Sequence, residues 1–507
     1  MNTEAEGVTE RIFVIRERLA VRYTKYAVLQ ILFAVLSIIL SFLYYIMVIS
    51  KMTLLEVSIL GESILIFNIS RIFFGLGIPY ALSHKTPKLV RQGRLSEAKY
   101  LVMILFERGL PLYIVLSLTT ALCLGLYLDI PSKYLIFTLI YDLFFIIFQC
   151  IMVSYQAFME LPKSSLIDNA RMLSYYFFII GLFYVFRNLE SIYYGWLLSI
   201  LVILPLAIVF TPIRHIQIRG NEKPREDLRD LLFFGFPQYV NYLLITLSTY
   251  VDQFFVAVFF TSEIFAIYYV LSRITKNIQS VISSIRIGTV PILSYFTGDK
   301  EKESKVFKLF FKFVLIFATG PFLVISIYSD AIIKLLLPPV YYVGVLTLSL
   351  LVLASFLTFI RSMIYAMILA YGDIKPLPLY TLLLLLMRIA SMYMLQLYGS
   401  EGIAMAVLIS ECVTILLIYI KYRSIIIIDT KFLAKLGGIS LILLFCSLRR
   451  IGALFLEFVI MSGLLGAYFL LLGFFRVLEK EEINYLMGTG NKILRILGKF
   501  FYILGNF

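Results

Sequence analysis

The stretch LLFFGFPQYVNYLLITLSTYVDQFFVAVFF, residues 231–260, decides the fold class. A helix needs about 20 apolar residues to cross a hydrocarbon layer of roughly 30 Å, and this mostly apolar stretch is longer than that. Similar segments recur along the 507 residues, which are 61% hydrophobic and only 15% charged. A soluble chain is about 25% charged. The sequence therefore predicts an all-α polytopic membrane protein and excludes a soluble enzyme and a disordered chain.

The apolar segments predict about 14 transmembrane helices, because backbone polar groups in lipid must be satisfied within their own segment. The expected spans are 27–49, 54–78, 100–128, 134–157, 165–186, 191–213, 231–260, 265–296, 311–328, 341–370, 377–398, 402–420, 436–447 and 452–475.

The basic residues predict the orientation of these spans, because Lys and Arg are retained on the cytoplasmic side. Of the 45 Lys and Arg residues, 30 lie in one set of alternate connectors and six in the other. We therefore expect a multi-pass protein of the cell membrane with both termini in the cytoplasm. The net charge of +14 is then mostly an orientation signal, and we expect no nucleic-acid partner.

The longest internal polar connector, RHIQIRGNEKPREDLRD, separates six expected spans from eight. PYALSHKT (79–86) and VPILSYFT (290–297) match at equivalent places in the two parts, which indicates a pseudo-symmetric internal repeat. Both ends carry apolar stripes among basic residues, as in helices that lie on an anionic leaflet. The expected organisation is an amphipathic cytoplasmic N-terminus (1–26), an N-terminal six-helix bundle (27–213), a cytoplasmic linker (214–230), a C-terminal six-helix bundle (231–420), two additional transmembrane helices (421–475) and an amphipathic cytoplasmic tail (476–507).

The chain offers little material for catalysis. The two histidines, His84 and His215, lie far apart, and the four cysteines fall within apolar runs, so we expect no metal site. No G-x-x-x-x-G-K-[ST] loop occurs, so we expect neither an ATPase nor a bound cofactor. The sequence favours a transporter that is not an enzyme.

Charged residues inside membrane spans are costly and are therefore candidates for function. The expected eighth span has a polar face with no acid after Glu263. Its three cations are Arg273, Lys276 and Arg286. Arg71 in the second span is their natural counterpart. Such groups suit a phosphate or pyrophosphate, through charge-assisted and often bidentate hydrogen bonds. The alternative is pairing across helices with acids such as Glu62, Asp142 and Asp252.

Other charges within the spans have structural explanations. Asp168 and Arg171 lie three residues apart on one helical face and are expected to neutralise each other. Near cytoplasmic ends, long side chains can extend to the headgroups. This applies to Arg108, Lys312 and Arg388.

The stretch FGFPQYVNYLLITLSTYVDQFFVAVFFTSEIFAIYYVLSRI (234–274) resembles the polysaccharide flippase branch of the multidrug/oligosaccharidyl-lipid/polysaccharide (MOP) exporter superfamily. The matching positions are Gly235, Pro237, Asp252, Tyr268 and Arg273. The resemblance continues through VPILSYFTGDKEKESK (290–305), which contains Pro291, to YGSEGIAMAVLIS (398–410). It covers 70–110 less closely. The family's Gly-x-x-Tyr is replaced by Pro338-Pro339-Val340-Tyr341.

The resemblance implies two six-helix bundles around a V-shaped cavity, plus two C-terminal helices. It implies a flippase that moves a polyprenyl-(pyro)phosphate-linked oligosaccharide from the cytoplasmic to the outer leaflet by alternating access. Cations of the cavity would hold the phosphate, and Asp252 or Glu62 would couple transport to an H⁺ or Na⁺ gradient. The expected partners of this monomer are its substrate, membrane lipids, and glycosyltransferases or a polymerase of the same pathway.

Four other functions stay open. An ion-coupled exporter of small drug-like cations from the same superfamily would need acids where the eighth span carries cations. A membrane glycosyltransferase or ligase would need larger outer connectors. A sugar porter would carry an acid after its second span, where HKTPKLVRQGRL (84–95) has none. A scaffold or scramblase-like protein is the least specific alternative.

Overall fold

The computed structural model describes residues 32–212, 228–284, 300–370, 376–423, 429–447, 454–478 and 502, apart from residues 34, 35, 75 and 476. Every regular element in this part of the chain is a helix. Within the described ranges, seven helices are long and apolar enough to cross a membrane, or up to nine if each of two bent pairs is one span. The chain is thus an all-α multi-pass membrane protein. The count of fourteen spans and the cytoplasmic termini stay predictions.

Three expected segments lie largely outside the described residues. They are the amphipathic N-terminus (1–26), the linker as far as residue 227, and nearly all of the amphipathic tail (476–507). The chain divides into two compact units, Met1–Tyr250 and Val251–Phe507. This division falls within helix α9 (Leu228–Phe259), whereas the sequence places a boundary at the polar linker just before it.

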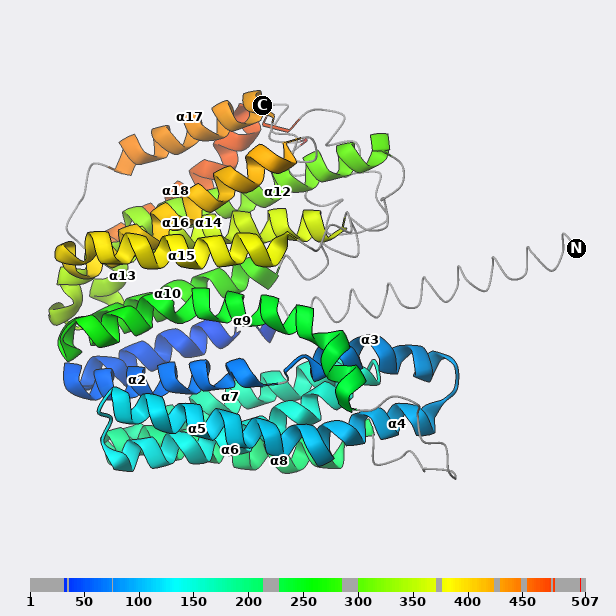
Figure 1. The fold of residues 1–507 in the computed structure, drawn as a ribbon. Coiled ribbons are helices and arrows are strands. Elements are labelled where there is room, and N and C mark those ends of the chain that lie inside the picture. Colours follow the sequence, from blue (N-terminus) through cyan, green and yellow to red (C-terminus); the bar gives the residue numbers. More distant parts are fainter. Residues whose placement is uncertain are drawn as a thin grey trace, which may run out of the picture. The chain divides into compact units, whose positions relative to one another are not determined.

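The first unit is a bundle of apolar helices. A short helix, Leu36–Lys51, precedes the others. They are α2 (Leu54–Ser70), α3 (Ile78–Arg91), α4 (Leu95–Ile104), α5 (Leu110–Tyr127), α6 (Ser132–Ala157), α7 (Leu161–Phe186) and α8 (Leu189–Val209). Helix α8 packs along α7 and α6, and α6 packs against α5, so these four run alongside one another (Figure 1). Because α6 and α8 are covered by neighbours, polar side chains on them can be buried away from lipid.

The second span is interrupted, where the sequence predicts one helix over 54–78. Helix α2 ends at Ser70, a 3₁₀ turn covers Arg71–Phe73, and α3 restarts at Ile78 with a bend of 55°. Gly77 has a φ of +94°, which only glycine adopts easily. Its backbone lies directly against that of Gly235 in α9, so that a Cβ on either residue would overlap the other. Gly235, predicted as a structural family position, thus permits a backbone-to-backbone contact with the start of α3.

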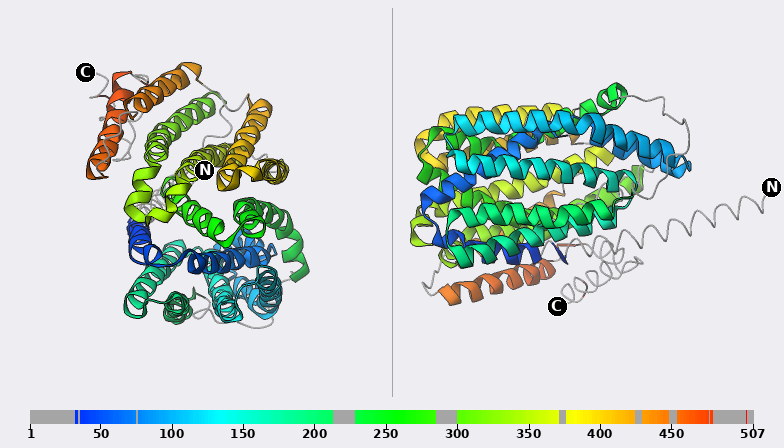
Figure 2. Two further views of the ribbon diagram at one scale, coloured as in Figure 1. Left: turned by 90° about the vertical axis from the view of Figure 1, so that its left-hand side faces the viewer. Right: turned by 90° about the horizontal axis from the view of Figure 1, so that it is seen from below.

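The second unit repeats this order of packing. Its helices are α10 (Ser262–Ser284), α12 (Lys300–Ile327), α13 (Ser329–Leu336), α14 (Val345–Ala370), α15 (Leu377–Leu395), α16 (Gly399–Tyr422), α17 (Thr430–Ser447) and α18 (Leu454–Phe474). Helix α14 packs against α10, α12 and α16, and α16 packs along α15. Helix α14 thus contacts α10, α12 and α16 as α6 contacts α2, α5 and α8. The internal repeat expected from the sequence stays a prediction. Figure 2 shows the helices of each unit from two further sides.

Helices α17 and α18 share a core with α12. This core contains Ile316, Leu436, Leu443 and Tyr468, all nearly inaccessible to solvent. The hydroxyl of Tyr468 donates a hydrogen bond of 2.7 Å to the carbonyl of Ile316. Gly320 lies under the ring of Tyr468, where a Cβ would overlap it. The last two described helices are therefore fixed to one side of α12.

Asp429 connects α17 to α12 by ion pairs. Its carboxylate lies 2.9 Å from the Nζ of Lys312 and 3.2 Å from that of Lys308. It also accepts a hydrogen bond from the backbone N–H of Phe432, as an N-cap does. Lys312, expected to extend to the headgroups, is instead buried in this pair. Burial favours the neutral acid, but the hydrogen bonds from Lys312, Phe432 and Lys308 outweigh it and lower the pKa of Asp429.

We expect Asp429→Asn to release α17 from α12, because asparagine keeps the N-cap but loses both ion pairs. Amide hydrogen exchange over residues 430–447 should rise roughly 10-fold at neutral pH, and the half-exposed partner Lys308 keeps the effect moderate. The pKa of Asp429 is lower in the folded protein than the unfolded value of about 4. The ion pairs therefore stabilise α17 fully above that pH, and their contribution is lost as the pH falls through the folded pKa. In the wild type, the protection of the α17 amides from exchange, corrected for the intrinsic exchange rate, should fall on acidification. In Asp429→Asn this pH-dependent fall should be absent. Equal protection in both proteins at neutral pH would contradict this role.

Candidate functional site

Two of the three cations predicted on the eighth span, Arg273 and Lys276, lie on α10, which packs against α14 and α16. Arg273 and Lys276 are both at least partly buried. The ammonium of Lys276 interacts electrostatically with Asp252 and with two like charges, Arg273 and Arg388. Cations thus gather on this side of α10, a setting that favours an anionic ligand. Arg286 lies outside the described residues, as does Pro291.

Asp252 is buried on α9 and is held by a tyrosine. The hydroxyl of Tyr268 donates a hydrogen bond of 2.8 Å to its Oδ2. Its Oδ1 is buried and has no hydrogen-bond partner among the described residues. One turn of helix away from this contact, Gln253 donates to the hydroxyl of Ser272 at 2.7 Å. The family positions Asp252 and Tyr268 therefore form one contact, which leaves a carboxylate oxygen able to take a proton or a cation.

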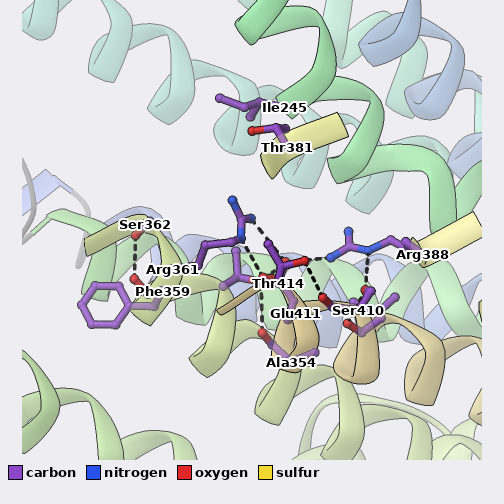
Figure 3. A network of polar contacts seen from close by, with 12 residues as sticks. Ile245, Ala354, Phe359, Arg361, Ser362, Thr381, Arg388, Ser410, Glu411 and Thr414 are labelled. Atoms are coloured by element: carbon purple, nitrogen blue, oxygen red, sulfur yellow. Dashed lines mark hydrogen bonds and ion pairs between the residues drawn. The ribbon is translucent and has the colours of Figure 1, made fainter. Parts of the chain in front are cut away.

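Glu411 on α16 holds two arginines from neighbouring helices (Figure 3). It lies 2.7 Å from Arg361 on α14 and 2.7 Å from Arg388 on α15. Thr358 also donates a hydrogen bond to it at 2.9 Å, and Glu411 is only 1% exposed. Two cations share one acid, so this buried group carries a net positive charge. Arg388 was expected to extend to the headgroups, but this pair buries it instead.

Arg71 lies at the interruption of the second span, in the 3₁₀ turn after α2. Its guanidinium lies on the rings of Phe67 and Phe145, 5.0 and 4.3 Å from their centroids. It makes no hydrogen bond or ion pair with a described residue. Stacking uses the face of a guanidinium and leaves the N–H donors at its edge, in the geometry that binds phosphate or carboxylate.

The acids of the first unit are bound by hydroxyl groups. Asp142 accepts hydrogen bonds from Ser117 at 2.6 Å and Ser70 at 3.1 Å, and its Oδ1 has no partner among the described residues. Glu62 accepts one from Ser58 at 2.8 Å. Asp142 attracts Arg71 electrostatically without forming an ion pair with it. The alternative explanation for Arg71, pairing with Glu62 or Asp142, is therefore not what the structure contains.

Sequence comparison connects this geometry to a known family. The model of the polysaccharide biosynthesis protein family matches residues 24–297, more than half of the chain. The chain belongs to this family. No curated protein gives a significant sequence match. The match includes Arg71, Gly235, Asp252 and Arg273 and ends at residue 297, before the last motifs of the predicted resemblance.

Solved structures agree on the fold of this family member. A lipid II flippase, MurJ, in an inward closed conformation is 14% identical with a TM-score of 0.66, over 87% of this chain and 98% of that one. An inward-facing multidrug resistance MATE family transporter of the MOP superfamily is 14% identical with a TM-score of 0.55, over 77% and 94%. The MATE transporter VcmN of Vibrio cholerae, in its bent form, is 15% identical with a TM-score of 0.53, over 79% and 96%. These likenesses show a fold shared with a transporter of the MOP superfamily, and the family match confirms the predicted membership in a polysaccharide family.

Within this family member, the sequence identified the cations of α10 and Arg71 but assigned no role to Arg361 or Glu411. The sequence gives little indication that Arg361 and Glu411 pair, because they are 50 residues apart and lie on different helices. The expected neutralisation of Arg171 by Asp168 is confirmed by an ion pair of 2.9 Å. Pro237 lies inside α9.

Proposed function

We propose that the protein is a flippase that moves a polyprenyl-(pyro)phosphate-linked oligosaccharide from the cytoplasmic to the outer leaflet by alternating access. The observation that carries the proposal is the guanidinium of Arg71. It is stacked on two phenylalanines within an interrupted membrane helix and makes no ion pair with a described residue. An oriented cation at membrane depth is costly without an anion to bind. A phosphate or pyrophosphate on a lipid carrier would supply that anion.

The second unit supports the same substrate chemistry. Arg273 and Lys276 lie in the same electrostatic neighbourhood as Arg388, and Glu411 already binds both Arg388 and Arg361. A small cationic drug would be repelled by such a group, whereas a phosphate would be attracted. Membership in the polysaccharide biosynthesis protein family makes a glycan-bearing lipid the natural source of that phosphate.

We further propose that transport is coupled to H⁺ or Na⁺ through Asp252, with Glu62 as the counterpart in the first unit. The free lone pairs of Asp252 Oδ1 support this role, because a buried carboxylate oxygen without a donor is a suitable acceptor for either ion. The protein would act as a monomer in the cell membrane without catalytic chemistry of its own. Glycosyltransferases of the same pathway would supply its substrate.

The proposal is tested with full-length protein in proteoliposomes that contain a fluorescent polyprenyl-pyrophosphate-linked oligosaccharide. We expect wild-type protein to transfer this lipid between leaflets and Arg71→Ala to slow transfer roughly 10- to 100-fold, since a hydrogen bond to a charged group contributes about 1.5–3 kcal/mol. Arg71→Lys should be intermediate, because it keeps the charge and loses the planar fork. As a control, Arg94→Ala removes a cation that pairs with Glu97 at the surface and should transfer normally. Export of a small organic cation without lipid transfer would overturn the proposal in favour of a drug exporter.

A further inference from the structure

A pocket of about 620 Å³ lies in the first unit, away from Arg71 in sequence and formed by other helices. Its lining residues are Ile46, Met47, Lys51, Phe183, Tyr184 and Arg187. They belong to the last turns of the Leu36–Lys51 helix and to the end of α7. The two helices are in contact through Tyr44 and Tyr176, whose ring centroids are 6.2 Å apart. The volume is within the range of roughly 300–1,000 Å³ that small-molecule sites occupy.

Of the described residues that line this pocket, two are cations and none is an acid. The side chains of Lys51 and Arg187 are exposed, and neither forms an ion pair with a residue that the structure describes. Both belong to the Lys- and Arg-poor side of the expected topology, which carries only six basic residues. Of the other four, Lys133 pairs with Glu190 at 2.7 Å, Lys334 pairs with Asp330 at 3.4 Å, and Arg449 and Arg450 lie outside the described residues. Positive charge on this side is therefore scarce, and two cations that pair with no described residue share one pocket.

The backbone of Arg187 adds an independent observation. This residue caps the end of α7 with a φ of 51° and a ψ of 37°, the left-handed conformation. A non-glycine residue pays about 1 kcal/mol for that conformation, and glycine is the usual residue at such a cap. Arginine occupies this position despite the strain. A cation near a helix C-terminus is favourable for the helix itself, so the experiment must separate that effect from ligand binding.

The remaining walls are apolar. Phe183 is buried, whereas Ile46, Met47 and Tyr184 are 41%, 39% and 69% exposed. On a membrane protein, exposed apolar side chains beside a polar end contact acyl chains. A free phosphate would use only the two cations, but a lipid with an anionic head would use the apolar rim as well.

We propose that the Lys51–Arg187 pocket binds an anionic phospholipid of the outer leaflet. The phosphate is held by Lys51 and Arg187, and the acyl chains run along Ile46, Met47 and Tyr184. This binding is independent of the transported substrate. It uses different residues and would persist in protein that does not transport.

The test is native mass spectrometry of the full-length protein titrated with phosphatidylglycerol. We expect Lys51→Gln with Arg187→Gly to weaken binding of one phosphatidylglycerol at least roughly 10-fold, because two charge-assisted contacts are lost. Glycine suits the left-handed cap, so this variant should fold as well as wild type. The matched control, Lys133→Gln with Lys334→Gln, removes the same charge from the same side and should bind normally.

Two further arms separate the alternatives. Phosphatidylcholine, with no net charge, should bind more weakly than phosphatidylglycerol. Inorganic phosphate at millimolar concentration should not displace the lipid, and full displacement would overturn the proposal in favour of a free-anion site. Unchanged phosphatidylglycerol binding in Lys51→Gln/Arg187→Gly would also overturn it. If the variant bound lipid normally but unfolded at a lower temperature, the role of Arg187 would be to stabilise the C-terminus of α7.

Discussion

Replacing Arg273 and Lys276 together by alanine is expected to abolish the proposed delivery of a lipid-linked oligosaccharide to the outer leaflet. If each cation contributes about 1.5–3 kcal/mol to holding a phosphate, losing both slows delivery at least roughly 100-fold. The protein should remain folded and inserted, because Lys276 also experiences two like charges, Arg273 and Arg388, whose repulsion the change reduces. Delivery is measured in proteoliposomes, and folding is measured by thermal unfolding of the same sample.

Two controls make this result interpretable. Arg273→Lys with Lys276→Arg keeps both charges on α10 and should retain most of the delivery. Lys133→Ala with Lys334→Ala removes two cations from exposed ion pairs and should deliver normally. Wild-type delivery by the alanine double variant would contradict a role for α10 in binding phosphate. If that variant did not fold, the charge-preserving exchange and the Arg71 variants would still decide the question.

The second large effect is expected from Glu411→Gln. The carboxylate neutralises Arg361 and Arg388 while only 1% exposed, so its loss leaves two buried guanidinium groups without a counter-charge. Removing one partner of a buried ion pair typically costs about 3–5 kcal/mol. The midpoint of thermal unfolding in lipid nanodiscs should fall by several degrees or more, and the second unit should unfold first.

Glu97→Gln is the matched control for this change. It alters the same chemical group, but its partner Arg94 is 53% exposed, and such surface pairs contribute about 0–1 kcal/mol. A second comparison is Glu411→Leu with Arg361→Met and Arg388→Leu, which removes the whole group. Because replacing all members by apolar residues is often neutral, this triple variant should be more stable than Glu411→Gln. Equal stability of Glu411→Gln and wild type would show that the two arginines do not depend on Glu411.

Much of the fold could be predicted from the sequence, because lipid leaves the backbone few choices. The segment expected at 134–157 is helix α6, Ser132–Ala157, and the segment expected at 165–186 is most of α7, Leu161–Phe186. The predicted candidates Asp252 and Tyr268 are joined by a hydrogen bond. The helix predictions succeed because hydropathy is a local property of the chain, whereas the roles expected for Asp252 and Tyr268 stay predictions.

The interruption at Arg71–Ile78 could not be predicted in the same way. Leu54–Phe73 and Ile78–Val90 differ in direction by 55°, although residues 72–78 at the bend are all apolar or glycine. The bend depends on Gly77 and on a neighbour in α9, more than a hundred residues later. Likewise, Arg388 and Glu411 meet only when α15 and α16 pack together. Hydropathy contains no information on such pairings.

The contact between Gly77 and Gly235 has a consequence for how this chain can change during evolution. Most packed pairs can drift, because a larger residue at one position is offset by a smaller one at the other. Here each residue already lacks a side chain, and the space a methyl group would need is filled by the other's backbone. No exchange at one site can compensate for a change at the other. We therefore expect both positions to remain glycine in related sequences, although more than a hundred residues separate them along the chain.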